Sequence, residues 1–186
     1  MLDDLRGPLG PALRRAGGAF AAAGLPPTFW TALSFALACA SGLAYWLAGP
    51  LAGGALLLAS GALDIVDGQV ARISGRESRR GAFLDSFLDR ASEIAVFAGI
   101  LAAGLADPMH VLAALSISML ATYARARADS LGASAGRAYV GGRAERLLVL
   151  AVSGMAGYTE YGVIIVAVMA AAAAVQRAAS AVRKLG

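Results

Sequence analysis

Four aspartates lie between Asp64 and Asp89 of an otherwise apolar chain. Asp64 and Asp67 are three residues apart, and Asp85 and Asp89 are four apart, so each pair shares one face of a helix. A carboxylate in hydrocarbon costs at least about 2.5 kcal/mol at a helix centre. Four carboxylates with this free-energy cost indicate a functional site.

Two helices joined by a short loop are expected to pack antiparallel, which would let the two pairs of carboxylates face each other. Converging carboxylates repel one another unless they take up protons or bind cations. Ligand sets made only of oxygen suit hard ions such as Mg²⁺, Mn²⁺ or Ca²⁺ rather than zinc. Four carboxylates are enough to hold two ions, an arrangement used to clamp phosphoryl groups.

Small residues accompany the acids. Gly68 in mid-helix costs about 1 kcal/mol relative to alanine, which suggests that something bulky approaches the backbone there. Arg72, one turn later, is in reach of a phosphate or a base edge. Gly75 and Gly81 flank the loop between the two pairs, and helix packing would explain them equally well.

The composition is that of a polytopic membrane protein. The chain has 186 residues, of which 59% are hydrophobic and 15% charged, whereas a soluble domain has about 25% charged residues. We expect one all-α domain over residues 1–186. Its apolar stretches cover residues 28–48, 51–72, 82–104, 109–129, 140–157 and 160–180, each near the about 20 residues that span a bilayer. The second and third stretches contain the aspartates, and the alternative for them is an interfacial or buried helix.

The basic residues predict the orientation. They form four groups, which precede the first stretch, surround the second and fourth breaks, and close the chain: Arg6, Arg14 and Arg15; Arg72, Arg76, Arg79, Arg80 and Arg90; Arg125, Arg127, Arg137, Arg143 and Arg146; Arg177, Arg183 and Lys184. Positive charge in short loops marks the cytoplasmic side. The net charge of +4 is therefore a topology signal rather than a sign of nucleic-acid binding. Both termini and the acidic segment are predicted to face the cytoplasm from the cell membrane.

Residues 1–24 precede the predicted bundle of residues 25–186. Leu2, Leu5, Leu9 and Leu13 recur at helical spacing among charged residues, while Pro8 and Pro11 would interrupt a long helix. This pattern favours a short amphipathic helix on the cytoplasmic face of the membrane. The alternative is a disordered basic arm.

The acidic segment carries a specific pattern. Asp64-x2-Asp67-Gly68-x2-Ala71-Arg72-x8-Gly81-x3-Asp85-x3-Asp89 resembles the signature of the CDP-alcohol phosphatidyltransferases at all eight specified positions and every gap. The resemblance implies six membrane helices, a cytoplasmic active site and a homodimer. It also implies transfer of a phosphatidyl or archaetidyl group from a CDP-linked lipid to an alcohol, with release of CMP.

The resemblance also implies roles for individual residues. The four aspartates would bind two Mg²⁺ (or Mn²⁺) ions that bridge the pyrophosphate, and Asp89 would also be the general base. The implied CDP-lipid site comprises Gly68, Ala71, Arg72, Gly81, Pro27 and Thr31. One departure is Thr28, which stands where family members often have asparagine.

The acceptor is predicted from arginines near the cytoplasmic ends of the fourth and fifth stretches. Arg125, Arg127, Arg143 and Arg146, joined by Arg183, are candidates for binding a phosphate of the acceptor. The surrounding sequence resembles the branch that makes phosphatidylinositol phosphate or archaetidylinositol phosphate, so inositol phosphate is the expected acceptor. The bland alternative is that these arginines only anchor the topology.

Two other functions stay open on the sequence. Glycerol 3-phosphate satisfies the same phosphate argument, which would make the protein a phosphatidylglycerophosphate synthase. In a different class, intramembrane acids could line the path of a divalent cation transporter. Against transport, the acids cluster at one membrane face and no polar trail continues through the outer halves of the helices.

Overall fold

Helices and turns make up the computed structural model, which describes residue 15 and residues 17–133 and 141–186, and these residues contain no strand. The all-α class is therefore confirmed. A short helical segment at residues 17–22 precedes six longer helices. These are α2 (Pro27–Leu47), α3 (Pro50–Ile73), α4 (Arg79–Ala102), α5 (Pro108–Ser130), α6 (Arg143–Met155) and α7 (Thr159–Leu185).

Local sequence signals set where the helices begin. Proline occupies the start of α2, α3 and α5, where its missing N–H costs no hydrogen bond. The Ser78 side chain caps α4 by accepting a hydrogen bond of 3.0 Å from the Gly81 N–H. In the turn that separates α3 from α4, Gly75 has a φ of +64°, a conformation that glycine adopts without strain.

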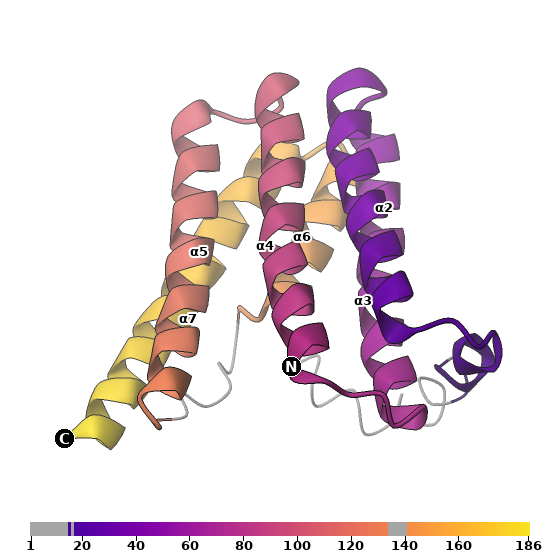
Figure 1. Cartoon of the computed structure of the whole chain (residues 1–186). Coiled ribbons are helices and arrows are strands. Elements are labelled where there is room, and N and C mark those ends of the chain that lie inside the picture. The colour runs from indigo at the N-terminus through magenta and orange to yellow at the C-terminus, as the bar shows by residue number, and fades with distance from the viewer. Residues whose placement is uncertain (1–14, 16, 134–140) are drawn as a thin grey trace.

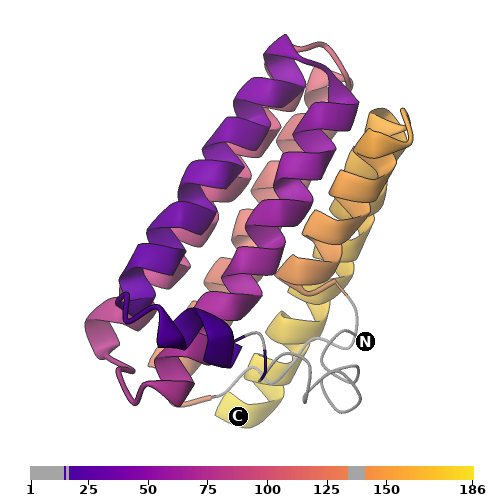
Figure 2. The ribbon, with the colours of Figure 1, turned by 90° about the vertical axis from the view of Figure 1, so that its right-hand side faces the viewer.

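The helices run side by side along a common direction (Figures 1 and 2). Helix α2 packs against both α3 and α4, α6 packs against α3 and α7, and α5 packs against α7 and, less extensively, α4. In Figure 1 the α3–α4 turn and the C-terminal ends of α5 and α7 lie at the lower end of the bundle. We call this the site end, because the aspartate segment lies there.

The prediction that the two helices carrying the aspartates pack directly against each other was wrong. Helices α3 and α4 are consecutive, but they make little direct contact and pack against α2 instead. Glycines favour this arrangement: a Cβ at Gly42 would collide with the Ala95 carbonyl, and a Cβ at Gly99 would collide with the Gly42 backbone. Helices α2 and α4 therefore meet backbone to backbone, as small residues allow in membrane bundles. The carboxylates of α3 and α4 still converge, across a space that α2 borders.

Four described helices, α2, α3, α5 and α7, are long and apolar enough to cross a membrane. Helix α4 has 24 residues but carries several charges, and α6 has 13 residues, or about 20 Å, less than the about 30 Å of the hydrocarbon core. The protein is thus a multi-pass membrane protein, and six spans stay a prediction.

The amphipathic segment predicted for residues 1–24 lies mostly outside the described residues, as do Arg6, Arg14 and Arg137. Within the described part, the ring of Phe20 contacts Trp30 edge to face, with 4.9 Å between ring centroids. Trp30 is buried together with Val66 and Val70 of α3. Residues 17–22 therefore pack on the site ends of α2 and α3.

Candidate active site

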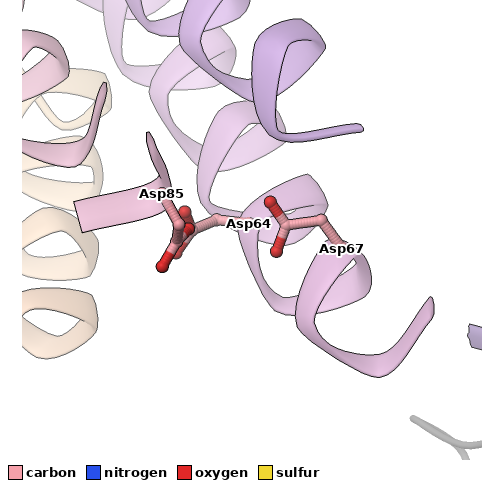
Figure 3. A group of neighbouring side chains, drawn as sticks. All are labelled: Asp64, Asp67 and Asp85. Carbon is pink, nitrogen blue, oxygen red and sulfur yellow. The ribbon is translucent and has the colours of Figure 1, made fainter. Parts of the chain in front are cut away.

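Three of the four aspartates form one cluster. Asp64 and Asp67 on α3 and Asp85 on α4 point toward one another (Figure 3), and one carboxylate oxygen of each lies within 4.8 Å of the others. Asp67 is only 6% exposed, and its Oδ2 atom has no hydrogen-bond partner. Thr31 lies close enough to give Asp67 a side-chain hydrogen bond. A buried, partly unpartnered set of oxygen ligands fits a hard divalent cation.

Asp89, the fourth aspartate, is held by arginines next to this cluster. Nη1 of Arg143 lies 2.7 Å from Asp89 Oδ1 and donates a hydrogen bond of 2.8 Å to Asp64 Oδ2. Nη2 of Arg90 lies 3.6 Å from Asp89 Oδ2. One guanidinium therefore connects the last acid of the motif with the first, and Asp89 lies beside the three-carboxylate group.

A cavity of about 770 Å³ opens beside Asp67 and Asp85. It is lined by all six residues of the predicted CDP-lipid site: Pro27, Thr31, Gly68, Ala71, Arg72 and Gly81. A Cβ built on Gly68 would meet no other atom within 4 Å, so the missing side chain leaves open space in the cavity. The six residues come from α2, α3 and α4, which the fold brings together around one open cavity.

Sequence reasoning missed part of this cavity. Its lining also includes Arg76, Glu77, Ser78 and Arg79 from the α3–α4 turn, and Thr28, the residue in the usual asparagine position. The Arg72 guanidinium lies 3.9 Å from the Glu77 carboxylate, with both side chains well exposed. The brevity of the turn is the signal that could have found these residues, because a short turn keeps them next to the motif on both sides.

The predicted acceptor arginines are not gathered in one place. Arg143 lies at the carboxylates, whereas Arg146 is 3% exposed, pairs with Glu93 and donates a hydrogen bond of 2.7 Å to the Gly141 carbonyl. Arg125 and Arg127 are exposed at the end of α5. They are two residues apart, or about 200° around the helix, so they cannot point the same way.

The exposed arginines have local partners. Nε of Arg125 lies 3.8 Å from Asp129 Oδ2, and Nη1 of Arg127 donates a hydrogen bond of 3.4 Å to the Ser130 hydroxyl. Arg183, near the end of α7, donates from Nε to the Ala179 carbonyl at 3.2 Å. Each contact stays within one helix, so these arginines are not tied to the carboxylates in the structure.

Two buried charges that were not predicted to belong to the site lie next to it. Glu93 on α4 is 2% exposed and contacts three arginines. Arg177 on α7 is 7% exposed, donates a hydrogen bond of 2.7 Å to the Ala121 carbonyl, and is close enough to Arg125 and Arg146 to be repelled by them. The signal for both was available, since a charged residue inside an apolar stretch is expensive without a purpose.

Comparisons with known sequences agree with the motif. The family model described as CDP-alcohol phosphatidyltransferase matches residues 25–179. The archaetidylinositol phosphate synthase of Methanothermobacter thermautotrophicus is 40% identical over 134 residues, which cover 72% of this chain and 68% of that protein. The archaetidylinositol phosphate synthase of Pyrococcus horikoshii is 28% identical over 185 residues, which cover 100% of this chain and 98% of that protein.

Solved structures share the fold. The phosphatidylinositol phosphate synthase of Mycobacterium tuberculosis with CDP-DAG bound has 26% identity and a TM-score of 0.76, covering 91% of this chain and 92% of that one. The same synthase in complex with manganese and citrate has a TM-score of 0.80, covering 94% of this chain and 90% of that one. Motif, carboxylate cluster, cavity and family match agree: the chain belongs to the CDP-alcohol phosphatidyltransferase family and is a membrane-embedded phosphatidyltransferase.

Proposed function

We propose that this enzyme transfers a phosphatidyl or archaetidyl group from a CDP-linked lipid to inositol phosphate and releases CMP. The observation that carries the proposal is the position of Arg143, whose guanidinium contacts both Asp64 and Asp89. A cation at this place can receive the phosphate of an acceptor whose hydroxyl is brought to Asp89. The relatives named as archaetidylinositol phosphate and phosphatidylinositol phosphate synthases support the same acceptor.

The CDP end of the donor is proposed to occupy the cavity beside Asp67. Gly68 leaves room for the nucleotide, and Pro27, Thr31, Ala71 and Gly81 complete the walls. The Arg72 guanidinium can donate forked hydrogen bonds to a phosphate or to the base. The cavity lies next to the acids, so the pyrophosphate of the bound donor would reach the carboxylate cluster while the lipid chains stay in the bilayer.

Asp64, Asp67, Asp85 and Asp89 are proposed to hold two divalent ions, Mg²⁺ or Mn²⁺. When bound there, such ions neutralise the charge of the pyrophosphate and of the departing CMP. The unpartnered Oδ2 of Asp67 supports this role. Asp64 and Asp89 share Arg143 as a neighbour, so a cation that binds either of them competes with a guanidinium.

Asp89 is proposed to be the general base of the transfer. The acceptor hydroxyl oxygen forms a bond to the lipid-bearing phosphorus, the phosphorus–oxygen bond to CMP breaks, and the hydroxyl proton passes to the Asp89 carboxylate. CMP leaves with the bonding electron pair, so atoms and charges balance without a further reactant. Arg143 holds the Asp89 carboxylate in place through its contact at 2.7 Å.

The acceptor phosphate is proposed to bind at Arg143 and Arg146, which share a face of α6, with Arg125, Arg127 and Arg183 approaching from the ends of α5 and α7. Arg143 has the strongest support, because it is the member of this set that contacts the motif acids. Long arginine side chains at helix ends can reorient toward a phosphate at low cost. Arg125, Arg127 and Arg183, whose contacts in the structure stay within their own helices, would have to turn toward the phosphate when the acceptor binds.

The transport alternative loses its basis once the family is known. Within the described residues, the cluster of acids is confined to the site end, and the family match covers all of α2 to α6 and most of α7. We propose that the protein crosses the plasma membrane six times and that both termini and the site end face the cytoplasm. We also propose that the enzyme is a homodimer. Alternation of the arginine-rich loops supports the orientation.

A thin-layer assay with purified enzyme tests the proposed reaction. CDP-diacylglycerol and CDP-archaeol are each offered with inositol phosphate, glycerol 3-phosphate or free inositol. We expect product with inositol phosphate and none with free inositol. Turnover of glycerol 3-phosphate alone would keep the phosphate site and replace the alcohol, whereas turnover of free inositol at the same rate would overturn the phosphate site.

A further inference from the structure

Glu93 is a buried carboxylate that contacts three arginines at once. It lies on α4 one turn after Asp89 and is 2% exposed. Its Oε2 atom lies 3.2 Å from Arg90 Nη1, and its Oε1 atom lies 3.2 Å from Arg146 Nη2 and 3.8 Å from Arg143 Nε. Glu93 does not belong to the aspartate motif, and the proposed reaction assigns it no step.

Each of the three arginines also contacts a different part of the site end. Arg90 donates a hydrogen bond of 2.6 Å to the Thr122 hydroxyl on α5. Arg146 donates to the Gly141 carbonyl just before α6, and Arg143 contacts the motif acids. Glu93 therefore lies at the centre of a network of ion pairs and hydrogen bonds that joins α4, α5 and α6.

The contact between Glu93 and Arg143 involves a specific atom of the guanidinium. The buried Nε atom of Arg143 has no hydrogen-bond partner, and the Glu93 carboxylate is the negative charge that faces it. Attraction between Glu93 and Nε orients the guanidinium of Arg143 so that its Nη1 atom contacts Asp64 and Asp89. A neutral group at position 93 would leave two buried guanidiniums, those of Arg143 and Arg146, without this shared counter-charge.

We propose that Glu93 is a positioning residue for the acceptor: it fixes Arg143 and Arg146 at the place where the phosphate of the acceptor alcohol binds. Glu93 touches neither substrate and acts only through the two arginines. This inference rests on the proposed function, because it presumes that the acceptor carries a phosphate. It predicts that substitutions of Glu93 weaken the binding of the acceptor and leave the binding of the CDP-lipid donor unchanged.

The test measures KM for donor and acceptor separately in Glu93→Gln and Glu93→Asp. Glu93→Gln keeps the size of the side chain and removes its charge, and we expect the acceptor KM to rise by about tenfold or more. Glu93→Asp keeps the charge but retracts it by one methylene. We expect its acceptor KM to rise as well, by a smaller factor, with the donor KM within twofold of wild type, and thermal unfolding in detergent checks that the variant is folded.

The aspartate variant separates positioning from a structural role. A residue that serves only as a buried counter-ion would be replaced by aspartate without a change in acceptor KM, and that result would overturn the proposal even if Glu93→Gln does not fold. An equal loss of donor and acceptor affinity would overturn it too. The matched control is Glu160→Gln, which removes a carboxylate that pairs with His110 at the opposite end of the bundle and is expected to leave both KM values unchanged.

The choice of acceptor does not decide this test. Kinetics are measured with whichever phosphorylated alcohol the wild-type enzyme turns over, so failure of inositol phosphate corrects the proposed function and leaves the Glu93 comparison intact. A second measurement uses inorganic phosphate as a competitor of the acceptor. We expect its inhibition constant to rise in Glu93→Gln in parallel with the acceptor KM, and an unchanged inhibition constant contradicts the positioning role.

Discussion

The guanidinium of Arg143 donates a hydrogen bond of 2.8 Å to the carboxylate of Asp64, 79 residues earlier in the chain. The same nitrogen lies 2.7 Å from Asp89. This relationship places a fixed positive charge between the first and last acids of the motif, and it joins the arginine-rich start of α6 to the acidic segment of α3 and α4.

Arg143→Gln should raise the acceptor KM by about ten- to a hundredfold, because a charge-assisted bond to phosphate contributes roughly 1.5–3 kcal/mol. Donor KM should change little. The control is Arg80→Gln, an exposed arginine of α4 outside the cavity lining. If both variants show the same small change, Arg143 does not bind the acceptor and the proposed acceptor site is wrong.

Chelation should abolish activity, and added Mg²⁺ or Mn²⁺ should restore it, because the close carboxylates of Asp64, Asp67 and Asp85 repel one another and form an oxygen ligand set that suits a divalent cation. Asp67→Asn should lower Mn²⁺ binding, measured by electron paramagnetic resonance, as well as turnover. Asp107→Asn, at the N-cap of α5 far from the cluster, is the matched control and should bind Mn²⁺ like wild type. Full turnover in EDTA after verified metal removal contradicts the metal site.

Asp89→Asn should lower kcat by about 10²–10⁴-fold, the range of general acid–base catalysis. CDP-lipid binding should be largely kept, since a base acts on the acceptor hydroxyl and Asp89 lies beside the three-carboxylate group. Donor affinity is measured by equilibrium binding of the CDP-lipid to the variant in detergent. Complete loss of that binding would show that Asp89 acts chiefly as a metal ligand.

Gly68→Val should raise the donor KM by at least about tenfold, equal to roughly 1.4 kcal/mol, because the new side chain enters the cavity proposed for the nucleotide. Stability should change little, since a Cβ at Gly68 meets no atom within 4 Å. Gly61→Val, two turns earlier in α3, also adds its side chain to open space and controls for the helix-propensity cost. Equal donor KM values in the two variants would place the nucleotide elsewhere.

Gly99→Val should destabilise the bundle by about 1–3 kcal/mol or more, because its side chain would collide with the Gly42 backbone where α2 and α4 touch. Thermal unfolding in detergent measures the loss. The same Gly61→Val variant is the control, with the same substitution in open space. A thermal midpoint equal to that of the control would mean that α2 and α4 separate easily there, contrary to the packing.

Much of the fold could be predicted from local patterns. The apolar stretch 28–48 became α2 (Pro27–Leu47), and 109–129 became α5 (Pro108–Ser130), because proline marks each start. The stretch 140–157 was predicted less well: α6 runs over Arg143–Met155 and is short for a span. Hydropathy follows lipid exposure and burial alike, so it cannot tell a short buried helix from a membrane-spanning one.

The sequence by itself determined the chemistry at Asp64, Asp67 and Asp85, because fixed spacing on a helix decides which side chains share a face and a short turn keeps two helix ends together. Only the tertiary structure decided which arginine meets them. Arg143 is 79 residues from Asp64, and Arg146 is 53 residues from Glu93. The physical reason is that a long-range ion pair depends on which helices pack and at what rotation, here through α2 and α6, and no local period records that choice.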